Sequence, residues 1–309
     1  MPTLVFDLTG RGELVLSGKD RAALLHGLLT NDVNGLKPGT GCYAALLTPK
    51  GKMQADLTVL CHQDRLVVDC EPELVSKLAR LIPGYVFFQE VLVEDRTLET
   101  AVLHLCGRAA AELLSTVGLP VPSAESAHAH AEAGSGVVVV RERRTGADGF
   151  DLRVRRDAAA ELLDRLSEAG AAAGTPEELE SARIAAGIPR WGAELDESVL
   201  PNEARLERNA ISYNKGCYMG QEIVARIRTY GHVNRLLVGL TLPSDVARGA
   251  ELRAGDALVG RVTSATRSAR GGFVALGYLR REHAEPGTEV QVEGAQGPMT
   301  GTVVELPVA

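Results

Sequence analysis

Residues 215–222 read Lys-Gly-Cys-Tyr-Met-Gly-Gln-Glu and carry the thiol of Cys217, the side chain of this chain best suited to covalent chemistry. Lys215 lies two residues before the cysteine, and a run with helical spacing begins at Gln221. Backbone N–H groups at a helix start and a nearby ammonium both favour the nucleophilic thiolate. The alternative is a small buried apolar residue in a glycine turn. The two interpretations predict an exposed, reactive thiol or a buried, inert one.

The neighbours of Cys217 have residue types that position a side chain. Two glycines supply turn geometry, and a glutamine and a glutamate can fix the start of the helix. We expect this helix over 221–230, because its apolar residues share one face and its charges are spaced four apart. The motif residues beside Cys217 and Lys215 are Gly216, Tyr218, Gly220, Gln221 and Glu222.

The charge around this motif differs in sign from that of the whole chain. The net charge of the chain is −7, which argues against direct binding of nucleic acid. Residues 205–235 nevertheless hold six basic and two acidic side chains. One interpretation is an anionic ligand, for which Arg226 is the candidate contact. The other is a solvated basic helix face.

Composition indicates a soluble globular protein of about two domains. Of its 309 residues, 45% are hydrophobic and 24% charged. We expect a cytoplasmic protein without membrane contact, because no apolar run has the length of a membrane span and the N-terminus does not resemble a signal peptide. The five cysteines form no Cys-x-x-Cys pair. The sequence therefore predicts neither a disulfide scaffold nor a permanently bound metal.

Predicted helices alternate with pairs of strands in the first half of the chain, which favours an α+β fold with a mainly antiparallel sheet. Short alternating runs and many glycines after residue 235 favour a small β-barrel. We expect strands at 4–8 and 13–16 around a turn, a helix after Asp20, a hairpin of 43–47 and 53–60, strands at 65–69, 86–93, 98–105, 137–141 and 150–155, helices at 73–82, 109–117 and 175–187, and a surface loop at 121–136.

The octapeptide resembles the signature of the YgfZ branch of the YgfZ/GcvT superfamily, which also contains the aminomethyltransferase, or T-protein, of glycine cleavage. Three weaker stretches agree with it in order and spacing. They are Leu-Thr-Asn-Asp-Val at 29–33, Pro-Lys-Gly-Lys-Met at 49–53 and Arg-Ile-Ala-Ala-Gly-Ile-Pro at 183–189. With the glycine-rich C-terminal region, the resemblance covers nearly the whole chain.

The resemblance implies a multidomain α+β fold in which segments of the chain interleave. Residues 1–50 and 150–234 correspond to a folate-binding domain, residues 51–149 to a ferredoxin-like inserted domain, and residues 235–309 to the C-terminal barrel. The implied cofactor is tetrahydrofolate or a one-carbon derivative. The candidate cofactor contacts are Asn31, Tyr43, Asp56 and Arg226, although Asn31 is also typical of a turn and Tyr43 of a packed strand.

The chain departs from the T-protein pattern at three positions. Ala55 stands where the first acid of the Gly-Gly-x-x-Asp-Asp block would lie, and Ala185 replaces the glutamate of Arg-x-Glu-x-Gly. Cys217 stands where T-proteins carry an aspartate. Loss of aminomethyl transfer is the expected consequence. Asp56 could substitute for the first acid only if a bulge turned it to the other face of its strand.

Three functions remain open from the sequence. The first is a YgfZ-like accessory protein that supports assembly or repair of iron–sulfur enzymes, including tRNA-modifying ones, through Cys217 and folate. Its implied partners are iron–sulfur enzymes or cluster-assembly proteins. The second is a tetrahydrofolate-dependent aminomethyltransferase. The third is a folate-binding scaffold without a reactive thiol.

Overall fold

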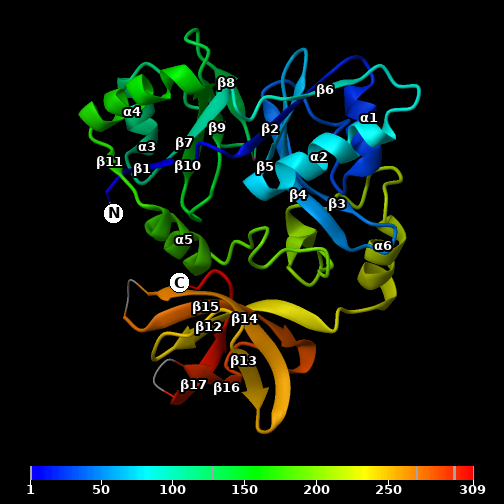
Figure 1. Ribbon diagram of the computed structural model, residues 1–309, viewed down its shortest axis with the longest axis vertical. Helices are drawn as coiled ribbons and strands as arrows, with labels where there is room; N and C mark the ends of the chain where they lie inside the picture. Colours follow the sequence, from blue (N-terminus) through cyan, green and yellow to red (C-terminus); the bar gives the residue numbers. More distant parts are fainter. Residues whose placement is uncertain (1, 127, 269–270, 295–296, 309) are drawn as a thin grey trace. The chain divides into compact units, whose positions relative to one another are not determined.

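The first half of the chain contributes strands to two β-sheets, as its alternating apolar residues predict (Figure 1). The computed structural model describes residues 2–126, 128–268, 271–294 and 297–308. By their contacts these residues divide into two units. The first comprises Met1–Lys50, Gln54–Pro176 and Asn209–Gln221, and the second comprises Gly51–Met53, Glu177–Arg208 and Glu222–Ala309.

The five-stranded sheet of the first unit has the strand order β3-β4-β5-β2-β6. The predicted hairpin of 43–47 and 53–60 is confirmed, because β3 and β4 are neighbours in this sheet. Leucines at 24, 25 and 28 are buried on α1, as its apolar stripe predicts. The elements are β2 (Gly12–Ser17), α1 (Arg21–Leu28), β3 (Thr40–Leu47), β4 (Met53–Cys61), β5 (Leu66–Cys70), η1 (Pro72–Leu74), α2 (Val75–Leu81), η2 (Pro83–Tyr85) and β6 (Leu92–Asp95).

The six-stranded sheet of the first unit has the order β11-β1-β7-β10-β9-β8. Alternate residues of its central strands, such as Leu103 and Phe150, join Leu114 and Leu166 of two helices in one apolar core. The elements are β1 (Leu4–Asp7), β7 (Thr100–Cys106), α3 (Ala110–Thr116), β8 (His130–Glu132), β9 (Val138–Arg141), β10 (Gly149–Arg155), η3 (Arg156–Ala158), α4 (Ala159–Glu168) and β11 (Ala172–Ala173).

The two sheets of the first unit contact each other through their remaining faces. Leu60 and Val67 of one sheet pack against Val140 of the other. Beside this small apolar cluster, Asp69 of β5 and Arg153 of β10 form a buried ion pair, with 2.7 Å between Oδ1 and Nη1. The strand sequences Leu-Val-Val-Asp-Cys and Phe-Asp-Leu-Arg-Val therefore place isolated charges between the sheets.

The second unit contains the predicted barrel, which is closed and has the order β12-β15-β14-β13-β16-β17 among the described residues. Its core includes Leu240, Leu252, Val262 and Leu279. The remaining elements are α5 (Pro176–Ala185), which begins in the first unit, η4 (Leu206–Arg208), α6 (Gln221–Tyr230), β12 (Arg235–Leu242), β13 (Glu251–Ala254), β14 (Ala257–Arg267), β15 (Phe273–Arg280), η5 (Arg281–His283), β16 (Glu289–Gly294) and β17 (Gly297–Val304).

Three local predictions were wrong. The strands near 4–8 and 13–16 do not pair with each other, because β1 pairs with β7 and β11 whereas β2 pairs with β5 and β6. The strand expected at 86–93 is confined to β6, which begins at Leu92 and leaves Phe87 and Phe88 exposed. The stretch 121–136 was expected to be a loop throughout, yet β8 lies in it and buries His130. Residue 127 of this stretch lies outside the described residues.

The α+β class and the C-terminal barrel are confirmed. The domain boundaries after residues 50, 149 and 234 stay predictions. The first lies in the turn between β3 and β4, the second at the start of β10, and the third immediately before β12. Within the described residues, none of the helices has the length and apolar character needed to cross a membrane.

Candidate functional site

Cys217 lies in an irregular segment four residues before α6, and it is exposed. Of the two interpretations of this residue, the exposure fits the accessible thiol and contradicts the buried apolar residue. Gly220 adopts a φ of 80°, a left-handed conformation that glycine tolerates best, immediately before α6 begins. The side chain of Gln221 accepts a hydrogen bond from the Tyr218 backbone N–H at 3.2 Å. The backbone conformation of Gly220 and the hydrogen bond of Gln221 fit the predicted roles of these residues in shaping the turn.

Lys215 contacts the end of α1. Its ammonium donates hydrogen bonds to the backbone carbonyl oxygens of His26 and, at 2.6 Å, Leu29. Carbonyl groups at a helix C-terminus lack partners within the helix, so Lys215 caps α1. Burial lowers the pKa of Lys215 to about 8. The ammonium also lies 5.0 Å from the ring centroid of Tyr218.

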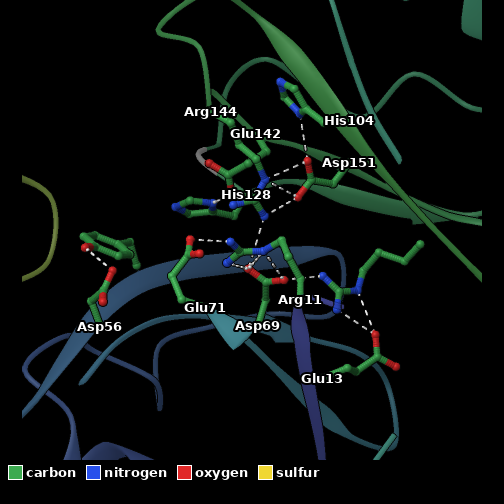
Figure 2. Close-up of polar contacts among 12 residues, drawn as sticks. Arg11, Glu13, Asp56, Asp69, Glu71, His104, His128, Glu142, Arg144 and Asp151 are labelled. Atoms are coloured by element: carbon green, nitrogen blue, oxygen red, sulfur yellow. Dashed lines mark hydrogen bonds and ion pairs between the residues drawn. The ribbon is translucent and has the colours of Figure 1, made fainter. Parts of the chain in front are cut away.

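Tyr43 and Asp56 form a hydrogen-bonded pair of titratable side chains in the first unit, and Figure 2 shows Asp56. The Tyr43 hydroxyl on β3 donates to Asp56 Oδ2 on β4 at 2.9 Å. Asp56 Oδ1 is buried and has no hydrogen-bond partner in the described structure. Burial, helped by the Glu71 carboxylate, raises the pKa of Asp56 to about 6, against the lowering effects of Tyr43 and Arg11. A carboxylate with a pKa near neutrality and a free oxygen is suited to acid–base chemistry.

The position of Asp56 changes the interpretation of Ala55. Successive residues of a strand point to opposite faces, and on β4 Met53, Ala55 and Leu57 are buried as a set while Gln54 and Asp56 are partly exposed. A side chain at position 55 therefore belongs to the apolar face. Asp56 lies on the opposite, polar face, beside Tyr43.

A buried layer of charges between the two sheets holds this region in place (Figure 2). Asp69 accepts hydrogen bonds from three arginines. One of them, Arg11, also donates a hydrogen bond from Nη1 to Glu71 Oε1 at 2.5 Å. Burial alone would raise the pKa of Asp69, but the arginines hold it well below its usual range. The members, named here the ion layer, are Arg11, Glu13, Asp69, Glu71, His104, Arg144, Asp151 and Arg153.

The other predicted contacts have less distinctive surroundings. Asn31 donates from Nδ2 to the carbonyl oxygens of Tyr43 and Asn209, at 2.8 and 3.2 Å, and accepts from the Asp32 N–H, which fits the turn interpretation. Arg226 and Glu222 are exposed on α6, in the second unit. The roles of these residues in binding stay predictions.

Arg183, two residues before Ala185 on α5, pairs with a buried glutamate of the second unit. Arg183 of α5 bonds Glu194 Oε2 at 2.7 Å and the hydroxyl of Ser264 on β14 at 2.8 Å. Burial alone would lower the pKa of Arg183, but Glu180 and Glu194 raise it. Arg183 therefore has a structural role, joining α5 to the barrel.

Sequence reasoning missed the ion layer and the contacts of His26. A signal for the first was available, since single charged residues within otherwise apolar strands are expected to be paired when buried. The His26 side chain contacts Asp32, with 3.1 Å between Nδ1 and Oδ1, and its Nε2 faces Gly216. It gave no such signal, because Asp32 is six residues away and Gly216 is about 190 residues away.

Comparisons with known proteins agree with this fold. The chain matches the model of the GCVT N-terminal domain over residues 3–215 and that of the glycine cleavage T-protein C-terminal barrel domain over residues 235–309. It is 31% identical to an aminomethyltransferase of Rubrobacter xylanophilus, covering 98% of this chain and 82% of the relative. It is 29% identical to a putative chloroplastic transferase of Arabidopsis thaliana, covering 98% and 71%.

Among solved structures, the glycine cleavage system aminomethyltransferase T of Bartonella henselae has the same fold. The TM-score is 0.91 at 24% identity, over 100% of this chain and 86% of that one. These matches identify the superfamily without singling out its YgfZ branch. The chain belongs to the family of the glycine cleavage T-protein.

Proposed function

We propose that this protein is a folate-dependent one-carbon transferase of the aminomethyltransferase type. The observation that carries the proposal is the Asp56 carboxylate, which has one oxygen held by Tyr43 and the other, Oδ1, buried and without a hydrogen-bond partner among the described residues. The names of relatives that match 98% of the chain support it. Sequence reasoning ranked this function second because Ala55, Ala185 and Cys217 depart from the T-protein pattern, and we propose Asp56, on the polar face of β4, as the acid that takes the place of the first of them.

The residues around Asp56 suit a ligand with N–H groups. Asp56 Oδ1 is a buried acceptor without a partner, and leaving such a group unpaired is costly, so a donor of the right shape is favoured there. When bound, tetrahydrofolate would supply the amine nitrogens that accept a one-carbon unit. Asp56 would hold or take up a proton at Oδ1. Tyr43 fixes the carboxylate through Oδ2, so that Oδ1 keeps its direction.

The test is transfer of an aminomethyl group from a lipoylated carrier protein to tetrahydrofolate, measured with wild type and Asp56→Asn. We expect turnover in wild type and a loss of about 10²-fold to 10⁴-fold in the variant, since it keeps the shape but not the base. Asp64→Asn is the matched control, because that carboxylate is exposed and pairs with Arg65. Absence of turnover in folded wild type would refute the proposal.

A second candidate is the accessory function in assembly or repair of iron–sulfur enzymes, including tRNA-modifying ones. The exposure of Cys217 favours it. Its partners would be iron–sulfur enzymes or cluster-assembly proteins. A deletion strain complemented with wild type or Cys217→Ser, and scored by iron–sulfur enzyme activities, tests it. Equal activities in the two strains would exclude a role for this thiol.

A further inference from the structure

The strand register of the five-stranded sheet sets a second carboxylate across from Asp56. β4 and β5 pair antiparallel, with Thr58 opposite Asp69. Alternate residues of a strand share a face, so continuing this register by two residues brings Asp56 opposite Glu71, which directly follows β5. Two acidic side chains therefore face each other on one side of this sheet.

Arg11 holds Glu71 from the other side. β2 and β5 also pair antiparallel, with Gly12 opposite Cys70, and one further step sets Arg11 opposite Glu71. The ion pair agrees with this register, because Arg11 Nη1 lies 2.5 Å from Glu71 Oε1, as Figure 2 shows. Arg11 also donates to Asp69, so its guanidinium is anchored at two points.

These side chains form a row across the sheet. Tyr43 on β3 donates to Asp56 Oδ2 at 2.9 Å, so the order along the row is Tyr43, Asp56, Glu71 and Arg11. Within the row, Asp56 Oδ1 is buried and lacks a hydrogen-bond partner among the described residues. Oδ1 is therefore the oxygen at which the row can accept a proton.

The charge of Glu71 opposes the ionised form of Asp56. Like charges disfavour each other, and the Glu71 side chain is only 20% exposed, so water screens its charge weakly. Burial raises the pKa of Asp56 to about 6 with the help of Glu71, whereas Tyr43 and Arg11 lower it. The titratable and charged groups near the Tyr43–Asp56 pair are Arg11, Cys70, Glu71 and Glu142, the last of which pairs with His128.

We propose that Glu71, held by Arg11, is a positioning residue for the transfer proposed at Asp56, because its charge makes Asp56 a stronger proton acceptor. Asp56 Oδ1 accepts the proton, and its neutralisation relieves the repulsion between the two carboxylates. Glu71 itself takes up no proton in this step. Its effect on rate rests on the proposed function, whereas its effect on the proton affinity of Asp56 can be measured without substrate.

The test is a ¹³C NMR titration of the full-length protein that follows the carboxyl carbon of Asp56, assigned by its loss in Asp56→Asn. Glu71→Gln removes the charge and keeps the shape, so the pH of half-protonation of Asp56 should fall by about one pH unit. The acidic limb of the pH–rate profile of aminomethyl transfer should move to lower pH with it. The rate at pH 7 should fall about twofold to fivefold, because Asp56 becomes a weaker base.

Glu73→Gln is the matched control, because it removes an exposed carboxylate two residues further along the chain. It should leave the midpoint of Asp56 in place, and Glu71→Asp, which keeps the charge, should stay closer to wild type than Glu71→Gln. A midpoint that falls in Glu71→Gln although wild type shows no turnover would support the electrostatic role of Glu71 and refute the transferase function alone.

An unmoved Asp56 midpoint in folded Glu71→Gln would overturn the role of Glu71, even with transfer intact. If this variant does not fold, the wild-type titration decides. The carboxyl carbon of Glu71 should then shift at the midpoint of Asp56, and a signal that stays in place through that pH would equally overturn the proposal.

Discussion

Removing the charge of Asp69 should destabilise the first unit strongly. Asp69 is buried and accepts hydrogen bonds from Arg11, Arg144 and Arg153 at 2.6 to 3.2 Å. Asp69→Asn keeps the volume but leaves these cations without their shared anion. Breaking a buried ion pair typically costs about 3–5 kcal/mol, and we expect a loss in this range. The free energy of unfolding is obtained from urea denaturation followed by far-UV circular dichroism.

The loss should also depend on pH. The folded pKa of Asp69 lies below the unfolded value of about 3.9, so its stabilisation is fully present above that value and is lost as pH falls through the folded pKa. Wild type and variant should therefore converge in acid. Asp64→Asn, which removes an exposed carboxylate, should change stability by at most about 1 kcal/mol. A cost for Asp69→Asn as small as that of Asp64→Asn would refute the ion layer as a stabilising structure.

Three further predictions concern single side chains. Tyr43→Phe removes a donor that lowers the pKa of Asp56, so the acidic limb of the pH–rate profile of transfer should move to higher pH; a limb that stays in place would contradict the assigned pair. Gly220→Ala forces a left-handed φ on a residue with a Cβ and should cost about 1–2 kcal/mol in thermal or urea unfolding, whereas no change would show that the turn relaxes freely. Arg183→Met removes the cation that pairs with the buried Glu194 and should lower the urea midpoint, followed by fluorescence of Trp191, the single tryptophan and a residue of the second unit. An unaltered midpoint would contradict the structural role.

Local patterns predicted much of the fold. The helix after Asp20, the hairpin of β3 and β4, the helix that begins near residue 175 and the barrel were each predicted where the corresponding element forms. The pairing of β1 with β7 could not be read in this way, because the partner strand lies about 95 residues away and only tertiary packing selects it. Helix α4 was missed, although its apolar residues Leu162 and Leu166 have helical spacing.

The candidate site was only partly predictable, because some of its contacts join segments that are far apart in the sequence. The motif around Cys217 is contiguous in sequence, so its turn and helix start could be predicted locally. The partners of its residues come from α1, and no local pattern shows that Lys215 caps that helix or that His26 faces Gly216. The face of Asp56 followed from strand alternation, but its polar surroundings depend on Tyr43 and Glu71 from neighbouring strands and loops.

The rate of aminomethyl transfer to tetrahydrofolate, compared between wild type and Asp56→Asn, tests the central claim most directly. Both proteins should be folded, as judged by circular dichroism, before rates are compared. The Asp56 carboxylate predicts measurable turnover in wild type and a loss of about 10²-fold or more in the variant, with Asp64→Asn unaffected. Equal rates for wild type and Asp56→Asn would contradict the claim that this carboxylate is the acid–base group.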